Sequence, residues 1–226
     1  GYSIITCSTN ESLGKEVKIL DFLCSGSVDG VIISTVAGEA QLSEHIAHFQ
    51  ELLQKQIPLV MFDRVTEMIE CDKVVVDDIE AGYKATKHFL KTGCRALAII
   101  NPIPNSSIGR LRIEGFKRAL EEQDIPFDSD MVVSLGADDD LELAISLSLN
   151  LKELNGILVF DEITTVKVMD LLRSKGFLIP KDISVIGFTN GELSRYASPP
   201  VTMISQHGRF IGETSANKLI DRIEGK

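Results

Sequence analysis

The chain has 226 residues, of which 44% are hydrophobic, so it can bury a sizeable core as one large or two small lobes. Its net charge of −10 and its isoelectric point near 4.9 argue against this segment binding phosphate backbones, which requires clustered Lys and Arg. No apolar run approaches the roughly 18 to 20 residues that a membrane span needs, so we expect no membrane partner.

Extended apolar runs alternate with amphipathic stretches along the chain, which is typical of a parallel α/β fold. The segments expected to be extended are residues 3–8, 28–34, 58–63, 73–77, 95–101, 131–134, 156–160, 183–188 and 201–206. The segments expected to be helical are residues 11–25, 42–54, 79–91, 106–123, 139–151, 162–175 and 208–223. Gly93 is expected to end the third of these helices, and the acidic run 138–140 suits the positive dipole end of the fifth.

The four cysteines are widely spaced and match neither a zinc pattern nor C-x-x-C; they are Cys7, Cys24, Cys71 and Cys94. Isolated cysteines in apolar segments are most often buried thiols, which suits a reducing compartment. The first residues lack the charged region and the cleavage site of a signal peptide. We therefore expect a cytoplasmic protein.

The most informative segment covers residues 183–206 and reads I-S-V-I-G-F-T-N-G-E-L-S-R-Y-A-S-P-P-V-T-M-I-S-Q. A short β-branched run ends at a glycine, a polar loop follows, Pro199 and Pro200 fix the path, and a second extended run ends at Gln206. Such a strand, loop and strand presents polar groups at the carboxyl end of a sheet, where open α/β folds bind ligands.

This segment closely resembles the signature of the lactose-repressor (LacI/GalR) family, D-V-S-V-[VI]-G-[FY]-D-[DN] followed by P-P-L-T-T and a nearby Gln. The positions that the chain keeps are Asp182, Ser184, Gly187, Phe188, Pro199, Pro200, Thr202 and Gln206. It has Thr189 where the family has an Asp that accepts hydrogen bonds from the ligand. The resemblance implies ligand contacts from Thr189, Asn190 and Gln206, which donate and accept hydrogen bonds without charge.

The resemblance spans essentially the whole chain and implies an α/β fold of two doubly wound parallel-sheet lobes, periplasmic-binding-protein type I-like, with a ligand cleft between them. Family members cross between lobes near Asp77–Asp78 and again near Gln206. Residues 1–77 plus 207–226 would then form the N-terminal lobe, and residues 78–205 the C-terminal lobe. Family members carry a helix-turn-helix, a hinge helix, a first strand and a first helix before the equivalent of Gly1, so the N-terminal lobe is expected to be incomplete.

A second motif is R-L-R-I-E-G-F followed by A-L, which resembles the family's R-x-x-G-F-x-x-A-L with Arg112 as its arginine. On a helix, Arg112 falls within the apolar stripe of Ile108, Leu111, Gly115 and Phe116. An arginine there needs acidic or hydroxyl partners, because burying it without a partner costs several kcal/mol. Its planar fork suits sugar hydroxyls or carboxylates in a ligand, and the alternative is a structural ion pair to a neighbouring Asp.

A third motif, Phe160-Asp161-Glu162, lies at a strand end and resembles the family's x-D-x-x-A turn. Asp161 is a candidate ligand contact, and it could instead cap the next helix. Phe160 could stack on a sugar or another planar ring, or belong to the core. These alternatives remain open on sequence alone.

Further polar candidates follow strands in the first part of the chain. Asp63, followed by Arg64, matches the family's V-D-R tail and could accept hydroxyl protons, cap a helix or pair with Arg64. Ser34 ends a similar strand. Asp77 and Asp78 occupy the family's D-N pair, and because neighbouring side chains on an extended chain point to opposite sides, a hinge or rim role is favoured over a catalytic dyad.

An enzyme is not indicated. The chain has no G-x-G-x-x-G after a strand, no G-x-x-x-x-G-K-[ST] and no G-x-S-x-G, so we expect no nucleotide cofactor and no catalytic set. The histidines lack metal-site spacing, and the pair His45 and His48 is expected to lie on a solvated helix face.

The sequence therefore predicts the effector-binding and dimerisation part of a LacI/GalR-type transcription regulator. It would bind a small polar molecule, a sugar or derivative, and contact operator DNA only through a segment outside this chain, as a homodimer. The alternatives are a solute-binding receptor of a sugar uptake system and an α/β enzyme acting on a sugar or nucleotide.

Overall fold

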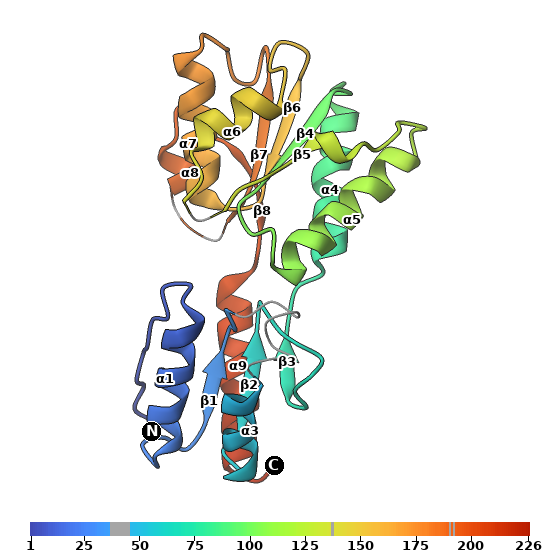
Figure 1. The fold of residues 1–226 in the computed structure, drawn as a ribbon. Helices are drawn as coiled ribbons and strands as arrows, with labels where there is room; N and C mark the ends of the chain where they lie inside the picture. The colour runs from blue at the N-terminus through green and yellow to red at the C-terminus, as the bar shows by residue number, and fades with distance from the viewer. Residues whose placement is uncertain (37–45, 137, 190, 192) are drawn as a thin grey trace. The chain divides into compact units, whose positions relative to one another are not determined.

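The computed structural model describes residues 1–36, 46–136, 138–189, 191 and 193–226. These residues form two compact units, each built around its own parallel sheet (Figure 1). Unit 1 comprises Gly1–Val76 and Arg209–Lys226, and unit 2 comprises Asp77–Gly208. The α/β class predicted from the alternating pattern, with doubly wound parallel sheets, is confirmed.

Unit 2 contains five parallel strands in the order β5-β4-β6-β7-β8. Their bounds are β4 Leu97–Asn101, β5 Val132–Ser134, β6 Gly156–Val159, β7 Ser184–Thr189 and β8 Thr202–Ser205. Every residue of β4 and β6 is buried, as expected for inner strands of a sheet that is covered on both faces. Ile99 pairs with Leu158 and Leu158 with Ile186, so aliphatic side chains form a continuous row across the sheet.

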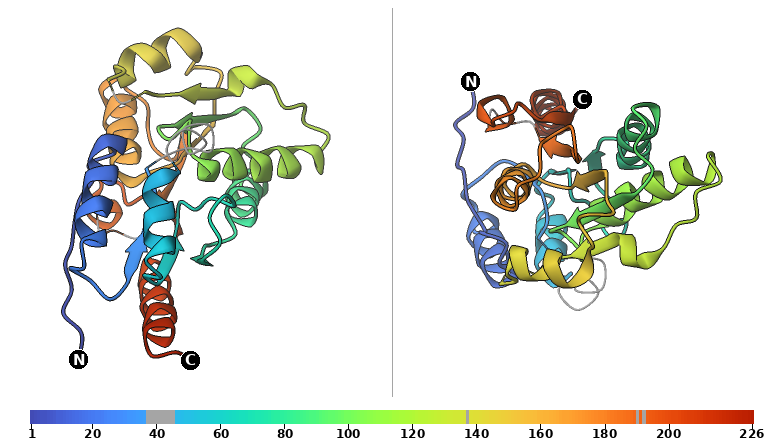
Figure 2. Two further views of the ribbon diagram at one scale, coloured as in Figure 1. Left: turned by 60° about the horizontal axis from the view of Figure 1, so that its bottom comes forward. Right: turned by 90° about the horizontal axis from the view of Figure 1, so that it is seen from above.

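Helices cover both faces of this sheet, as Figures 1 and 2 show. Their bounds are α4 Asp78–Lys91, α5 Ser107–Glu121, α6 Leu141–Ser148, α7 Glu162–Ser174 and the short α8 Leu193–Tyr196, with one 3-10 turn, η1, at Ser129–Met131. On one face, α4 and α5 bury Phe89 and Phe116 against the strands. On the other face, α6 and α7 bury Ile145 and Met169. Each of these four helices thus packs apolar side chains onto the sheet.

Unit 1 contains three parallel strands in the order β1-β2-β3. Their bounds are β1 Val31–Ile33, β2 Leu59–Phe62 and β3 Asp72–Val74. The helices α1 (Leu13–Cys24) and α3 (Ala47–Gln54) pack Leu20 and Phe49 onto one face. The last helix, α9 (Gly208–Ile223), packs Ile211 onto the other face, so segments from both ends of the chain build this unit.

One predicted strand does not form. Residues 3–8 adopt no secondary structure and are exposed. A strand needs a hydrogen-bonded neighbour, and within the described part of the chain β1 pairs only with β2. The apolar, β-branched composition of this run therefore predicted a strand that has no partner here.

One predicted helix is shorter in the structure. The helix expected at residues 139–151 ends at Ser148, and Asn150 instead forms a side-chain hydrogen bond to Glu153. Residues 42–45 of the helix expected at 42–54 lie outside the described residues. The turn between β7 and β8, expected to be a loop, contains the short helix α8. Gly93 adopts a φ of +92° just after α4, as expected for the residue that ends it.

Candidate functional site

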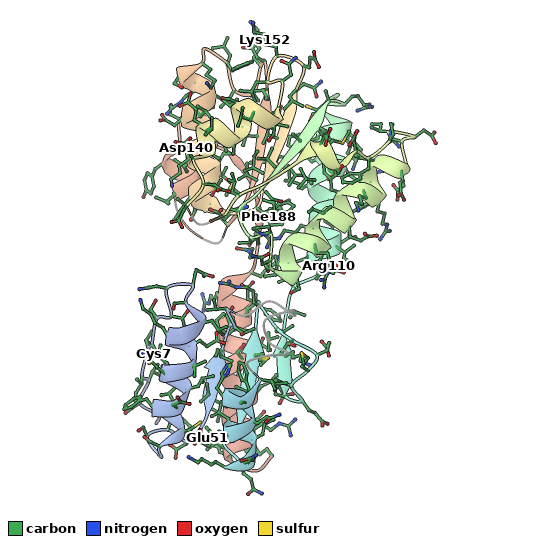
Figure 3. All side chains as sticks on the ribbon, viewed as in Figure 1. Cys7, Glu51, Arg110, Asp140, Lys152 and Phe188 are labelled. Carbon is green, nitrogen blue, oxygen red and sulfur yellow. The ribbon has the colours of Figure 1, made fainter. Side chains whose placement is uncertain are left out.

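The carboxyl edge of the unit 2 sheet gathers polar groups from four strands. Because the strands are parallel, Asn101 of β4, Thr189 of β7, and the residues after β6 and β8 all lie at this edge. Figure 3 shows Phe188, near the end of β7, and Arg110, at the start of α5, at the same end of unit 2. The sequence predicted this edge as the ligand-binding side of the sheet.

Two glycines set the separation of α4 and α5. A Cβ atom added to Gly82 would overlap the carbonyl oxygen of Arg112, and one added to Gly115 would overlap the backbone of Ile79 and lie 2.6 Å from the amide nitrogen of Tyr83. Real side chains cannot make such contacts, so only glycine allows the two helix backbones to approach this closely. The close approach brings Asp78, in the first turn of α4, to Arg112 on α5.

Arg112 is held on three sides in this arrangement. Its Nε donates to Asp78 Oδ1 at 2.8 Å, and its Nη1 donates to the carbonyl oxygen of Phe160 at 2.7 Å. The guanidinium carbon lies 3.9 Å from the centre of the Phe188 ring, which gives a cation–π contact. Arg112 is 1% exposed and Asp78 is 5% exposed, so each charge depends on the other for compensation.

Of the two alternatives for Arg112, the structure contains the ion pair and does not test the ligand contact. The ion pair with a neighbouring Asp is present, and Asp78 is that residue. Ligand contact by Arg112 stays a prediction. Sequence reasoning placed Asp78 at a hinge or rim and missed this pairing, because the register of two helices far apart in the sequence fixes it. The two glycines at matching turns were the available signal.

Phe160 lies under the guanidinium rather than at the surface. Its ring is 1% exposed and meets Phe188 edge to face at a centroid distance of 5.7 Å. Both rings belong to the core between the sheet and the helices α4 and α5. Of the two alternatives for Phe160, this placement agrees with core packing, and stacking on a ligand stays a prediction.

The end of β7 is fixed by two hydrogen bonds that Thr189 accepts. Its Oγ1 accepts from the amide of Gly191 at 2.7 Å, and its carbonyl oxygen accepts from the amide of Gln206 at 3.3 Å. Thr189 is buried and Gln206 half-buried, so neighbouring strand ends β7 and β8 present both residues at one edge. Asn190, the third residue predicted for this loop, lies outside the described residues.

Two of the predicted carboxylates cap helices. Asp161 accepts from the amide of Thr164 at 2.8 Å at the start of α7, as its structural alternative predicted. Asp77 accepts from the amide of Glu80 at 2.8 Å at the start of α4 and is itself exposed. Asp140 caps α6 in the same way through the amide of Leu143, which agrees with the role predicted for the acidic run. A capping carboxylate still has lone pairs for a ligand.

The predicted residues of unit 1 lie at the carboxyl ends of β1 and β2. Ser34 follows β1 and is half-buried. Asp63 follows β2 with a φ of +56°, and its amide donates to the carbonyl of Val74. Arg64 makes a two-pronged pair with Glu11, with both contacts at 2.7 Å. These hydrogen bonds, which Arg64 donates and Glu11 accepts, lower the pKa of the Glu11 carboxyl and raise the pKa of Arg64.

A buried polar cluster in unit 1 was not predicted. Glu16, in the first turn of α1, is 1% exposed and accepts from the hydroxyl of Thr35 at 3.0 Å and the amide of Val36 at 2.7 Å. His48 Nε2 lies 3.4 Å from its Oε1. The expectation of a solvated face is wrong for His48, which is buried, because α1 packs beside α3 at this point; His45 lies outside the described residues.

Other kinds of site find little support. A surface pocket of about 580 Å³ in unit 1 lies at the amino ends of β2 and β3, where Pro58, Cys71 and Arg222 contribute to its lining, and not at the carboxyl edge predicted for ligands. Among the described residues, no cluster of three or more His, Cys, Asp or Glu could hold a metal ion. In that part of the chain, no helix has both the length and the apolar composition to cross a membrane.

Comparisons with known proteins agree with the predicted family. A family model described as periplasmic binding protein-like domain matches residues 86–226. The HTH-type transcriptional repressor PurR of Vibrio atlanticus is 31% identical over 100% of this chain and 67% of its own length. The HTH-type transcriptional regulator DegA of Bacillus subtilis is 30% identical over 94% of this chain and 62% of its own length. The chain thus spans about two thirds of the length of these relatives.

Solved structures share the fold at lower identity. The transcription regulator CcpA of Lactococcus lactis superposes with a TM-score of 0.85 at 21% identity, over 100% of this chain and 81% of that one. The regulator CelR in complex with cellobiose has a TM-score of 0.78 at 23% identity, over 95% of this chain and 65% of that one. These relatives are named as regulators rather than enzymes or uptake receptors. The signature first seen in residues 183–206 and the similarity along the whole length together show that the chain belongs to the LacI/GalR family of transcription regulators, in the periplasmic-binding-protein-like domain of that family.

Proposed function

We propose that this chain senses a small polar effector, a sugar or sugar derivative, for a cytoplasmic transcription regulator that works as a homodimer. The observation that carries the proposal is the carboxyl edge of the unit 2 sheet, where Thr189 ends β7 and Gln206 follows the neighbouring strand β8, beside the buried pair of Arg112 and Asp78. Hydroxyl, amide and charged groups converging on one edge suit a ligand rich in hydroxyl groups.

Carbohydrate is supported by two neighbours in fold. CelR is described in complex with cellobiose, and a regulator-like protein from Alkaliphilus metalliredigens is described in complex with D-xylulofuranose. Both are under 25% identical to this chain, so they support the class of ligand through the fold alone. The relative from Vibrio atlanticus is named as a transcriptional repressor without a ligand, so the ligand screen below identifies the sugar.

We assign the contacts in this proposal as follows. Thr189, Asn190, Gln206, Arg112, Phe160 and Asp161 act from residues 78–206, and Asp63 and Ser34 act from residues 1–77, with Asp77 at the crossover. The effector binds in a cleft between two lobes, and the arrangement that binds it better becomes more populated. That shift changes how a DNA-binding segment outside this chain meets operator DNA.

A ligand screen followed by scattering tests the proposal. Thermal-shift screening of neutral mono- and disaccharides should yield a compound that raises Tm in a saturable way. Small-angle scattering at saturation should then show a smaller radius of gyration than without ligand. An unchanged radius at full occupancy contradicts closure, and turnover of the compound contradicts a purely sensing role.

A binding assay tests the separation of sensing from DNA contact. The chain carries a net charge of −10, and nonspecific DNA binding derives largely from neutralising phosphates with cations. Anisotropy titration of this chain with duplex DNA at moderate salt should therefore show no binding. Micromolar, salt-sensitive binding would contradict the proposed separation.

A further inference from the structure

The charge of Arg112 is already matched by a residue of the protein. Asp78 Oδ1 receives the Nε–H of Arg112 at 2.8 Å, and the carbonyl of Phe160 receives an Nη1–H at 2.7 Å. Both charged side chains are at least 95% buried. Asp78 also lies in the first turn of α4, where the helix dipole favours a negative charge. The pair is therefore electrically neutral and held in place.

The residues next to this pair differ in charge. In this chain the carboxylate stands on α4, and the end of β7 carries a hydroxyl that accepts from the amide of Gly191. The negative charge beside Arg112 thus comes from α4, and Thr189 at the end of β7 adds none.

We propose that Asp78 is a specificity-determining residue that makes this part of the effector site accept uncharged ligands and reject phosphorylated or carboxylate-bearing ones. The inference rests on the proposed function, since it concerns the same site. An anion at Arg112 would either displace Asp78, leaving a buried carboxylate without its counter-charge, or stand beside that carboxylate as a second negative group. Discrimination of this kind needs an element that repels the wrong ligand, and Asp78 supplies it.

The other charges of the same edge act in the same direction. Asp161 begins α7 next to Phe160 and uses its carboxylate to cap that helix. Thr189 and Gln206 add hydrogen-bonding groups without charge. A sugar hydroxyl can donate to these oxygens and accept from the amide and hydroxyl groups, whereas the charged oxygens of a phosphate or carboxylate can only accept and are repelled by the carboxylates of Asp78 and Asp161. The edge as built favours neutral polyhydroxy compounds.

Inorganic phosphate is a direct probe of this claim. Its effect on Tm is measured at constant ionic strength for the wild-type chain, Asp78→Asn and Asp140→Asn. Asp78→Asn keeps an oxygen for the Nε–H of Arg112 but leaves the guanidinium charge without compensation. Asp140→Asn is the matched control, because it also removes a carboxylate from the start of a helix in unit 2, at the N-cap of α6. All three proteins experience the same general effect of salt.

The expected result is a saturable phosphate effect in Asp78→Asn only. Phosphate should bind this variant at least about tenfold more tightly than the wild-type chain, the factor that one charged hydrogen bond provides. Saturable binding by the wild-type chain overturns the proposal, as does an unresponsive Asp78→Asn. An equal response of Asp140→Asn also overturns it, since the effect would then follow net charge alone.

A second measurement covers the case in which Asp78→Asn does not fold. The Nε–H resonance of Arg112 in the wild-type chain is followed by NMR during the phosphate titration, and it should not move because Asp78 occupies that donor. A saturable shift overturns the proposal. If the resonance shifts but a neutral carbohydrate still binds, the role of Asp78 is contradicted and the sensing function is not. If no carbohydrate binds and the resonance does not move, the sensing function is contradicted and the role of Asp78 in excluding anions is not.

Discussion

Each of the two units buries a charged side chain, but they compensate it differently. In unit 2, Arg112 has a full counter-charge in Asp78. In unit 1, Glu16 accepts hydrogen bonds from Thr35 and Val36, with His48 beside it. The first arrangement depends on two helix backbones in contact, and the second on a short segment that follows β1.

The difference teaches where each unit is vulnerable. The pair in unit 2 joins α4 to α5 and touches Phe188 in the core of the sheet, so its loss should unfold the unit as a whole. The cluster in unit 1 ties residues 35–36 to α1, so its loss should act mainly on that segment. Four predictions test this contrast, in order of decreasing effect.

Arg112→Met should cause the largest loss of stability. The substitution keeps much of the volume but leaves Asp78 buried without its cation, for which we expect a loss of about 3–5 kcal/mol in the free energy of unfolding. Urea unfolding followed by circular dichroism measures it. The matched control is Arg118→Met, on the same helix and also above an aromatic ring, 4.7 Å from Tyr83, but exposed; it should cost about 0.5 kcal/mol. Equal losses would contradict a buried pair.

Gly115→Ala should destabilise unit 2 by about 2–3 kcal/mol, because the new methyl group meets the backbone of Ile79 and Tyr83 and forces α4 and α5 apart. Gly212→Ala on α9 is the control, since nothing lies within 4 Å of its Cβ position. There alanine should stabilise the helix by up to about 1 kcal/mol. Differential scanning calorimetry of both variants decides, and the same sign for both would refute the tight helix contact.

Glu16→Ala should cost about 1–3 kcal/mol, since it leaves the buried hydroxyl of Thr35 and amide of Val36 without this acceptor. The loss should be local. Hydrogen exchange should accelerate at Val36 while amides in the inner strand β2 keep their protection. Exchange that accelerates uniformly through unit 1 would show that the cluster holds the whole unit, contrary to the proposed contrast.

The exposed ion pairs of unit 1 should matter least. Asp72, at the start of β3, accepts from Arg222 at 2.8 Å and from Lys218 at 3.3 Å on α9, and these hydrogen bonds lower the pKa of its carboxyl. A lowered folded-state pKa gives stability that is present above the unfolded pKa of about 4 and is lost as pH falls through the folded value. Asp72→Asn should therefore lower Tm slightly at pH 7 and not at strongly acidic pH. A Tm difference that persists in acid would contradict the assigned cause.

Most of the strands predicted from the sequence form in the structure, but one does not. Apolar runs separated by amphipathic stretches located the strands of both sheets, because inner strands such as β4 and β6 are buried along their whole length. The same kind of apolar run wrongly predicted a strand at residues 3–8. An apolar run indicates a preference for extended backbone, but it does not show whether a partner strand is present. Family motifs located Arg112 and the strand ends that form the candidate site.

Contacts between distant segments were beyond the sequence. The stripe on α5 showed that Arg112 faces inward, but its partner Asp78 lies 34 residues away and is selected by the register of α4 against α5. The burial of His48 likewise depends on the packing of α1 beside α3 and on Glu16, 32 residues away. Periodicity defines the face of one helix and does not identify the residue that meets it.

Hydrogen exchange of the chain with and without a saturating neutral carbohydrate from the thermal-shift screen tests the central claim most directly. The claim is that the effector binds at the carboxyl edge of the unit 2 sheet, around Arg112 and Asp78. The account predicts slower exchange at the amides that follow β6 and β7 and in the first turns of α4, α5 and α7. Slower exchange confined to the amino ends of β2 and β3, where the pocket of about 580 Å³ lies, would contradict it.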